Sequence, residues 1–370
     1  GMKSIILAAQ TIMCGDNEVV IAGGMENMST VPHYFAKGRE GQKLGDMKLV
    51  DGLVNDGLTD VYNRVHMGVC AEKCASEMNF TRAEQDAFAI ESYNRSTNAW
   101  NEGKFDNEII PIDLEDGSKF EKDTGPKTPD VEKIKSLRPA FREDGTVTAA
   151  TSSPFSIGAS AMLLTSEEYA KNNGLKIRAS IEGRAVAGVN WRMFGSGPVP
   201  AKAKALKNTG LTIDDIDVME INEAFAAQAL YCVKEANWDL DKVNMNGGAV
   251  ALGHPLGISG TRIITTLLNV MEQQDKSVGL ATMCVGTGQG ITTIIKRTPI
   301  SNDTFGNKIA KIKSNKLNIN FNLDQLKADN DFIYEENQSI SSPSALVDEP
   351  RHNNGSEKLS SLATLSKSSS

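Results

Sequence analysis

The feature that most constrains the fold is the alternation of strand-like and helix-like segments between residues 176 and 297. Short apolar runs, typical of buried strands, alternate with longer stretches in which apolar residues recur at helical spacing. The predicted strands are 177–185, 218–221, 279–284 and 290–296, and the predicted helices are 200–209, 223–237 and 257–274. Such alternation is typical of helices layered against a sheet, so we expect an α/β fold.

The first half of the chain is less regular. A predicted helix (2–12) and strand (18–24) come first, and a strand (160–164) and helix (166–173) close this half. Between them the sequence is charged and irregular, with a helix expected at 82–101. We therefore assign residues 1–30 and 145–175 to an N-terminal half, 31–144 to a loop domain, and 176–297 to a C-terminal half. Residues 298–370 are rich in Ser, Asn and Lys, and we expect a largely disordered tail there.

Composition excludes several classes of function. The net charge of −8 implies no basic face for nucleic acid, and the apolar runs are too short to span a membrane. The five cysteines are odd in number and scattered, which argues against a disulfide framework. Cys70 and Cys74 are four apart and could share a helix face, where we expect buried apolar side chains rather than metal ligands.

Two residues bracketed by glycines stand out as candidates for chemistry. His254 follows Gly253, and Cys284, 30 residues later, precedes Gly286, Gly288 and Gly290. Backbone without side chains lets a ligand approach closely, and a histidine with a cysteine suits carbonyl chemistry. An isolated histidine is otherwise commonly a satisfied core residue, and a cysteine after a strand is commonly a small buried one. The pattern favours the functional interpretation.

Four signals occur in a fixed order: Gly23 to Met28, Asn222 to Phe225, Gly253-His254-Pro255, and Cys284 with its glycines. Together they resemble the thiolase family over roughly residues 1–297, and most closely its acetoacetyl-CoA type of mitochondrial character. The resemblance implies a layered αβαβα fold of two related halves, of which the first is incomplete here. Related condensing enzymes carry a second histidine where Cys284 stands, so the cysteine favours a thiolase.

In thiolases the matching histidine activates a nucleophilic cysteine, and the second cysteine acts as acid and base. The resemblance therefore assigns these roles to His254 and Cys284, a catalytic water to Asn222, and an oxyanion-binding amide to Gly286. Read structurally, Asn222 is a helix N-cap followed by an acidic first turn. The family's nucleophile lies three residues before a Gly-Met-Lys like the one that opens this sequence. We expect it to be missing from an N-terminally truncated and inactive chain.

The resemblance also implies a site for a short acyl-CoA. Its members in this chain contact the acyl group, the pantetheine arm or the coenzyme: Leu58, His66, Met67, Lys133, Ser153, Phe194, Ala224 and Phe225. His66 and Met67 could equally be loop packing, and Lys133 a charged surface residue. No covalent cofactor is implied. The resemblance does imply a potassium ion. Its ligands would be Tyr93 and the backbone carbonyls of Ala149, Ala150, Ser152 and Val250.

Two departures from the family pattern count against activity. Thr151 and Ile157 stand where the family has Asn and Asp in the loop that contacts CoA. We therefore hold two hypotheses open. The first is an acetyl-CoA C-acetyltransferase that condenses two acetyl-CoA to acetoacetyl-CoA and runs the reverse thiolysis, in lipid and ketone-body metabolism. The second is an inactive relative that binds CoA or joins intact subunits. The resemblance suggests a homodimer or homotetramer, in the mitochondrion or alternatively the cytoplasm.

Overall fold

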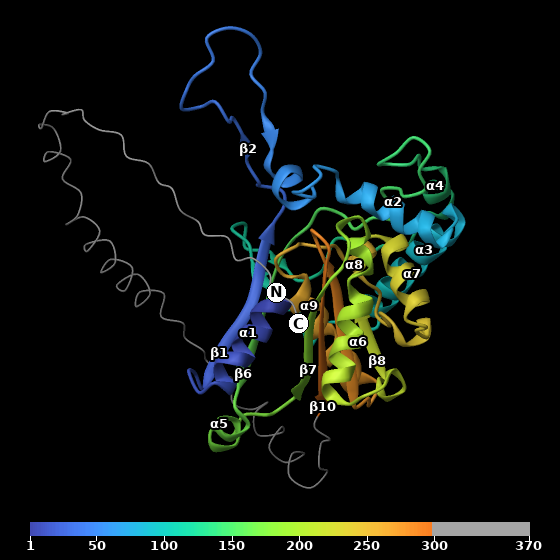
Figure 1. The fold of residues 1–370 in the computed structure, drawn as a ribbon. Helices are drawn as coiled ribbons and strands as arrows, with labels where there is room; N and C mark the ends of the chain where they lie inside the picture. The colour runs from blue at the N-terminus through green and yellow to red at the C-terminus, as the bar shows by residue number, and fades with distance from the viewer. Residues whose placement is uncertain (298–370) are drawn as a thin grey trace, which may run out of the picture. The chain divides into compact units, whose positions relative to one another are not determined.

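The computed structural model describes residues 1–297 and is built around a four-stranded sheet (Figure 1). The strands are β7 (Ala179–Gly188), β8 (Val218–Ile221), β9 (Val278–Val285) and β10 (Gln289–Arg297). Their order is β7-β10-β9-β8, with β8 parallel to β9 and the other pairs antiparallel. All four predicted strands are present, each within three residues of its expected bounds.

Helices cover both faces of this sheet, which explains why its central strands are apolar without alternation. On one face α1 (Met2–Met13) and α9 (Ser259–Gln273) pack against side chains such as Val218 and Ala281. On the other, α6 (Pro198–Thr209) and α7 (Ala226–Glu235) pack against Met219 and Leu280. Burying each large aliphatic side chain here contributes roughly 1.5–3 kcal/mol.

A second sheet belongs to the N-terminal half. Its strands β1 (Val19–Asn27) and β6 (Ile157–Thr165) pair antiparallel along their full length, and α1 packs against them. Successive side chains of β1 point to opposite faces of this sheet. Val20 and Ala22 turn toward α1 and α9, whereas Ile21 and Met25 stay 75% and 78% exposed. α5 (Glu167–Asn172) follows β6.

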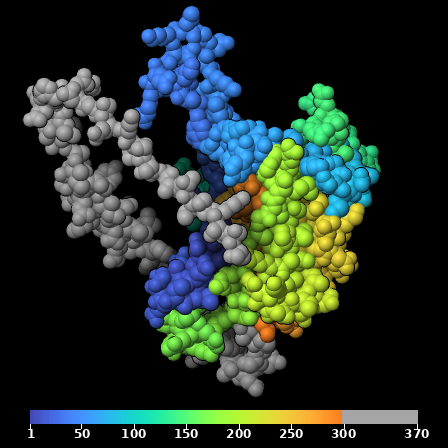
Figure 2. All heavy atoms as spheres, viewed as in Figure 1, coloured from blue at the N-terminus to red at the C-terminus, as the bar shows by residue number. Residues whose placement is uncertain are grey.

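The segment 31–144 is a long excursion from these sheets. It contains α2 (Met67–Met78), α3 (Arg82–Asn101), α4 (Val131–Ser136) and the π-helix η1 (Leu53–Gly57). Two short ladders pair β2 (His33–Tyr34) with β3 (Val50–Asp51) and β4 (Ile112–Asp113) with β5 (Lys119–Phe120). The loop between β2 and β3 projects away from the body of the protein (Figures 1 and 2).

Helix α3 matches its prediction at both ends, and Thr81 with Glu84 forms a capping box at its start. It packs against α7 and against the short helix α8 (Ala249–Leu252), so the loop domain is fastened to the C-terminal half. Three 3₁₀ turns complete the fold: η2 (Trp191–Ser196), η3 (Ile213–Asp215) and η4 (Leu240–Lys242).

One predicted helix starts late. The sequence indicated a helix over 223–237, but α7 begins at Ala226 because the preceding backbone is extended, with Phe225 at φ −145° and ψ 145°. That extended stretch forms an antiparallel bridge to Ser152 instead. Asn222 is therefore not the N-cap of α7. The predicted tail, 298–370, lies outside the described residues. Among residues 1–297, none of the helices combines the length and the hydrophobicity that a membrane span requires.

Candidate active site

Asn222 and Cys284 lie together because β8 and β9 run parallel and end at the same edge of the sheet. Ile221 is in register with Thr282, and the Asn222 amide nitrogen donates to the Thr282 carbonyl at 3.0 Å. Both side chains are buried, Cys284 at 4% exposure. Ligand sites of α/β proteins commonly form at the carboxyl ends of such strands.

His254 enters this site from the loop between α8 and α9. Gly253 before it has φ +98°, a conformation that side chains rarely adopt, and a Cβ there would lie 2.2 Å from Ser156 Oγ. The His254 Nε2 is 3.2 Å from Asn222 Nδ2, and its Nδ1 is 2.5 Å from Ser259 Oγ. The structure thus joins His254 directly to Asn222, next to the strand that carries Cys284.

Burial sets the protonation of both groups. It lowers the pKa of His254 to about 4, with the positive charge of Arg262 acting in the same direction. It raises the pKa of Cys284 to about 12, with a smaller contribution from Cys74. At neutral pH the site therefore holds a neutral imidazole and a protonated thiol.

Gly286 begins the tight turn between β9 and β10. Thr287 and Gly288 in this turn have φ values of +68° and +90°. A Cβ on Gly286 would lie 3.1 Å from Met67 Cε, so a larger residue would press on that side chain. Without a side chain, the backbone of Gly286 can be approached closely.

His66 and Met67 form one wall of the site, and their roles differ. His66 is the N-cap of α2, where its Nδ1 accepts from the Gly68 amide at 3.0 Å. Its ring stacks on Phe141 at 5.0 Å, and Phe141 meets Phe225 edge-on at 5.8 Å. Met67 is buried in the same hydrophobic cluster as Cys284 and Phe225. His66 thus positions the wall, while Met67 fills space beside the thiol.

The loop at 151–153 is tied to the segment after β8. Ser153 donates to the Ala224 carbonyl through both its amide (3.1 Å) and its hydroxyl (3.0 Å), and the Ala226 amide donates to the Thr151 carbonyl at 2.8 Å. The Thr151 hydroxyl accepts from the Thr148 amide at 2.8 Å, so the side chain at this departure from the family pattern is itself hydrogen-bonded. Ile157 is 63% exposed at the start of β6.

The remaining predicted residues are dispersed around this centre. Phe194 is buried in the cluster that holds Cys284, and the Leu58 carbonyl accepts from the Met67 amide at 2.8 Å. Lys133 is exposed on α4. Of the predicted potassium ligands, Tyr93 lies on α3 and Val250 on α8, two helices that pack together. The described residues contain no cluster of three His, Cys, Asp or Glu side chains suited to a metal.

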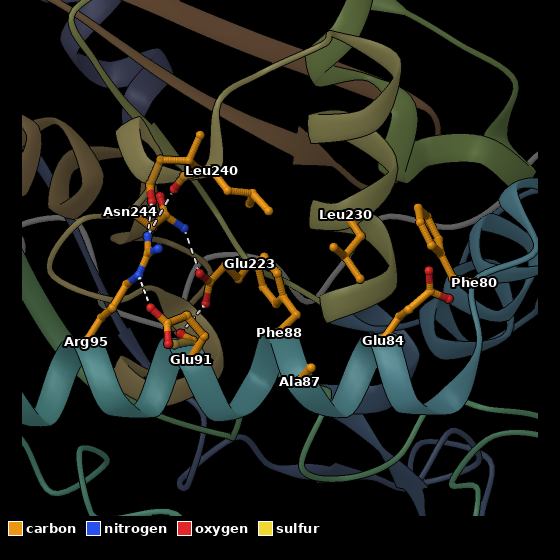
Figure 3. Close-up of a pocket in the computed structure, with 12 residues that line it drawn as sticks. Phe80, Glu84, Ala87, Phe88, Glu91, Arg95, Glu223, Leu230, Leu240 and Asn244 are labelled. Atoms are coloured by element: carbon orange, nitrogen blue, oxygen red, sulfur yellow. Dashed lines mark hydrogen bonds and ion pairs between the residues drawn. The ribbon is translucent and has the colours of Figure 1, made fainter.

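Glu223 is a site residue that the sequence interpretation missed. Its buried carboxylate accepts from Ser92 Oγ at 2.7 Å, from Asn244 Nδ2 at 2.7 Å and from the Val250 amide at 3.1 Å. Figure 3 shows the Asn244 side chain pointing toward Glu223, and both residues line a pocket of about 330 Å³ beside α3. Glu223 therefore links β8, α3 and α8, and holds its neighbour Asn222 in place. The available signal was an acidic residue two positions after the predicted strand 218–221.

Comparison with known families agrees with this geometry. The thiolase N-terminal domain matches residues 1–168, and the thiolase C-terminal domain matches residues 175–297. The chain belongs to the thiolase family. An acetyl-CoA acetyltransferase of Chromobacterium violaceum is 46% identical over 302 residues, 80% of this chain and 77% of the relative. That of Escherichia coli is 45% identical over the same shares of the two chains.

Solved structures place this thiolase in the same fold. The acetyl-CoA acetyltransferase of Bacillus anthracis superposes with a TM-score of 0.78 at 40% identity, over 80% of this chain and 76% of the other. Human mitochondrial 3-ketoacyl-CoA thiolase in complex with CoA gives 0.78 at 38% identity, over 80% and 75%. The predicted α/β thiolase fold is confirmed, and the chain belongs to a class of enzymes that act on acyl-CoA.

Proposed function

We propose that this thiolase interconverts two acetyl-CoA and acetoacetyl-CoA plus CoA. The observation that carries the proposal is the contact between His254 and Asn222 at the strand ends beside Cys284. A short acyl chain fits best, because Met67 fills the space next to that thiol.

In thiolysis, His254 Nε2 takes the proton of a nucleophilic thiol, whose sulfur attacks the keto carbonyl of acetoacetyl-CoA. The carbon–carbon bond breaks, and the departing acetyl-CoA carbanion takes the proton of the Cys284 thiol. The Cys284 thiolate then takes the proton of incoming CoA, which attacks the acetyl-enzyme. Finally, His254 returns its proton to the departing nucleophile. A water on Asn222 and the amide of Gly286 stabilise the two oxyanions.

The proton inventory supports these roles. With a pKa near 12, Cys284 rests as the acid that thiolysis requires, and His254 rests neutral as the base. In the synthetic direction, departing CoA takes the proton of Cys284, which leaves the thiolate to deprotonate the second acetyl-CoA. In both directions the thiolate arises within the cycle rather than by exchange with solvent.

The proposal includes a nucleophilic cysteine three residues before Gly1. Of the five cysteines of this chain, Cys284 is the one at the sheet edge beside Asn222, and it already serves as acid and base. The start of α1 lies against the α9 region: a Cβ on Gly1 would be 3.0 Å from the Ile258 carbonyl oxygen. A residue just before Gly1 would thus lie close to the segment that carries His254.

A thiolysis assay tests the proposal, with loss of acetoacetyl-CoA as its readout. The 370-residue chain is compared with a chain extended before Gly1 by the matching segment of a relative, and with the same extension carrying Ser for Cys. We expect turnover in the Cys extension alone. Comparable activity in the unextended chain would exclude this nucleophile. Inactivity of all three would favour the alternative, an inactive CoA-binding relative disabled at Thr151 and Ile157.

Potassium forms a separate part of the proposal. The carbonyl oxygens of Ala149, Ala150 and Ser152 accept no backbone hydrogen bond from the described residues, which leaves them suited to a hard cation. With Tyr93 and the Val250 carbonyl they would hold the ion and fix the loop that carries Ser153. We expect a higher thermal midpoint in KCl than in NaCl of equal ionic strength, and loss of the difference in Tyr93→Phe.

Assembly and location are further parts of the proposal. We propose a homodimer or homotetramer that meets acetyl-CoA in the mitochondrion. The bacterial origin of the relatives above supports the cytoplasm instead, while the human structural neighbour is mitochondrial. Sedimentation velocity and imaging of the tagged full-length protein distinguish these outcomes.

A further inference from the structure

Both ring nitrogens of His254 have hydrogen-bond partners, so the position of its proton can be inferred. Nε2 faces Asn222 Nδ2 at 3.2 Å, and Nδ1 faces Ser259 Oγ at 2.5 Å. The same Ser259 hydroxyl lies 3.0 Å from the Pro255 carbonyl oxygen. Ser259 is the first residue of α9 and is 1% exposed, which leaves its hydroxyl little access to solvent.

The hydroxyl of Ser259 has a single proton to donate. The Pro255 carbonyl can only accept, and in the structure the Ser259 hydroxyl donates to it beside the amides of Ile258 and Ser259, at 3.1 and 3.2 Å. The oxygen then offers a lone pair to His254, and Nδ1 must carry the ring proton. A neutral imidazole has one N–H, which leaves a lone pair on Nε2 that accepts from Asn222.

The opposite arrangement requires two side chains to give up the donor and acceptor roles that they have in the structure. With the proton on Nε2, the Asn222 amide would have to turn its oxygen toward the ring, and Ser259 would have to donate to Nδ1. The contact between Ser259 and Pro255 would then lose its proton. The first arrangement also leaves Asn222 Oδ1, which is buried without a partner among the described residues, free to hold a water.

We propose that Ser259 is a positioning residue that fixes His254 as its Nδ1–H tautomer and thereby turns the basic Nε2 lone pair into the active site. This inference rests on the proposed function, in which Nε2 takes the proton of the nucleophile. Its physical basis is general: the partner of one ring nitrogen decides which nitrogen is basic. Ser259 touches no reacting atom and acts through His254.

Nitrogen NMR of the 370-residue chain, labelled at histidine, measures the tautomer directly. The chain has four histidines, so the His254 resonances can be assigned by comparison with a His254→Gln sample. At pH 7.5 we expect a protonated Nδ1 and an unprotonated Nε2. A proton on Nε2 in the unmodified protein would overturn the proposal, and this measurement depends on no variant of Ser259.

Variants then test the cause. Ser259→Ala should shift the ratio of Nδ1–H to Nε2–H about tenfold toward Nε2–H, whereas Ser259→Thr, which keeps the hydroxyl, should preserve it. Thr265→Ala is the matched control, because the Thr265 hydroxyl also donates to a carbonyl four residues earlier in α9, at 3.1 Å, without touching His254. An unchanged ratio in a folded Ser259→Ala would refute the role of Ser259, as would an equal shift in the control.

Activity separates this inference from the proposed function. In the extended chain that carries the nucleophile, Ser259→Ala should lower kcat about tenfold with little change in KM, and Ser259→Thr should restore it. The expected tautomer in an extended chain that shows no turnover would refute the proposed function and leave the positioning role intact. Turnover of the extended chain with the ring proton on Nε2 would refute the positioning role and leave the proposed function intact.

Discussion

Replacing Glu223 by glutamine should loosen the junction between the loop domain and the sheet. The substitution keeps the shape of the side chain and removes its charge. Three groups from separate parts of the fold donate to this carboxylate: Ser92 on α3, Asn244 after η4, and the Val250 amide on α8. The Glu223 carboxylate accepts in all three hydrogen bonds. A glutamine, in contrast, offers one oxygen that accepts and one nitrogen that donates.

Asn244 cannot adapt to that change. Its Oδ1 accepts from the Ile221 amide at 2.8 Å, and its Nδ2 also donates to the Ile221 carbonyl at 2.9 Å, so its amide is fixed in orientation. A glutamine that places its oxygen toward Ser92 and Val250 therefore turns its NH₂ group toward the NH₂ group of Asn244. One buried donor loses its acceptor and meets a second donor.

The magnitude follows from these contacts. The unsatisfied donor costs about 1–3 kcal/mol, and the two remaining bonds each lose about 1 kcal/mol of charge assistance. Burial opposes the loss, because it raises the pKa of Glu223 and makes a neutral amide easier to bury than a carboxylate. We expect Glu223→Gln to lower the free energy of unfolding by about 2–4 kcal/mol.

Urea unfolding at pH 7.5, followed by tryptophan fluorescence, measures this difference. Glu235→Gln is the control, because Glu235 is exposed at the end of α7 and should change stability by less than about 0.5 kcal/mol. If Glu223→Gln were as stable as the unmodified protein, Glu223 would already be protonated in the fold, and the argument from three donors would fail.

Three further predictions concern other groups. Iodoacetamide at pH 7.5 should label the exposed Cys14 and spare Cys284. A pKa near 12 leaves only on the order of 10⁻⁴ to 10⁻⁵ of the Cys284 thiol ionised. Rapid labelling of Cys284, detected by mass spectrometry, would contradict this. Burial raises the pKa of Glu220 from 4.5 to about 8, so the folded state binds this proton more tightly than the unfolded state does. The free energy of unfolding, measured in urea, should therefore fall as pH rises from 5 to 8, and Glu220→Gln should make that fall smaller. Gly253→Ala should destabilise the protein more than Gly15→Ala. Both glycines have positive φ, but a Cβ at Gly15 meets open space, whereas one at Gly253 meets Ser156. Equal unfolding midpoints of the two variants would refute the close approach at Gly253.

The framework of the fold could be predicted from sequence because its signals are local. Strand β8 was placed at its observed bounds, since a short, mostly apolar segment between turn residues indicates a buried strand, even with Glu220 inside it. Helix α3 was also placed at both ends. The start of α7 was not, because the extended conformation of Phe225 is imposed by its bridge to Ser152, 73 residues earlier.

The same distinction applies to the site. His254 and Cys284 could be identified because glycines next to them mark backbone that must approach something closely. Their neighbours depend on contacts between distant segments. Ser92 and Glu223 are separated by 131 residues, and no local pattern connects a serine inside a charged helix to an acid after a strand.

Ser259 shows why geometry adds to what a motif can supply. It lies five residues after His254, and in the sequence it is one small polar residue near the start of a helix. The role of Ser259 follows from two contacts of its hydroxyl group, one with His254 Nδ1 and one with the Pro255 carbonyl oxygen, because the hydroxyl has one proton for both. A residue type indicates which protons are available, whereas only the positions of the acceptors decide where each proton goes. The basic character of His254 in this site is therefore a property of its surroundings, and it should change with Ser259 while His254 itself is untouched.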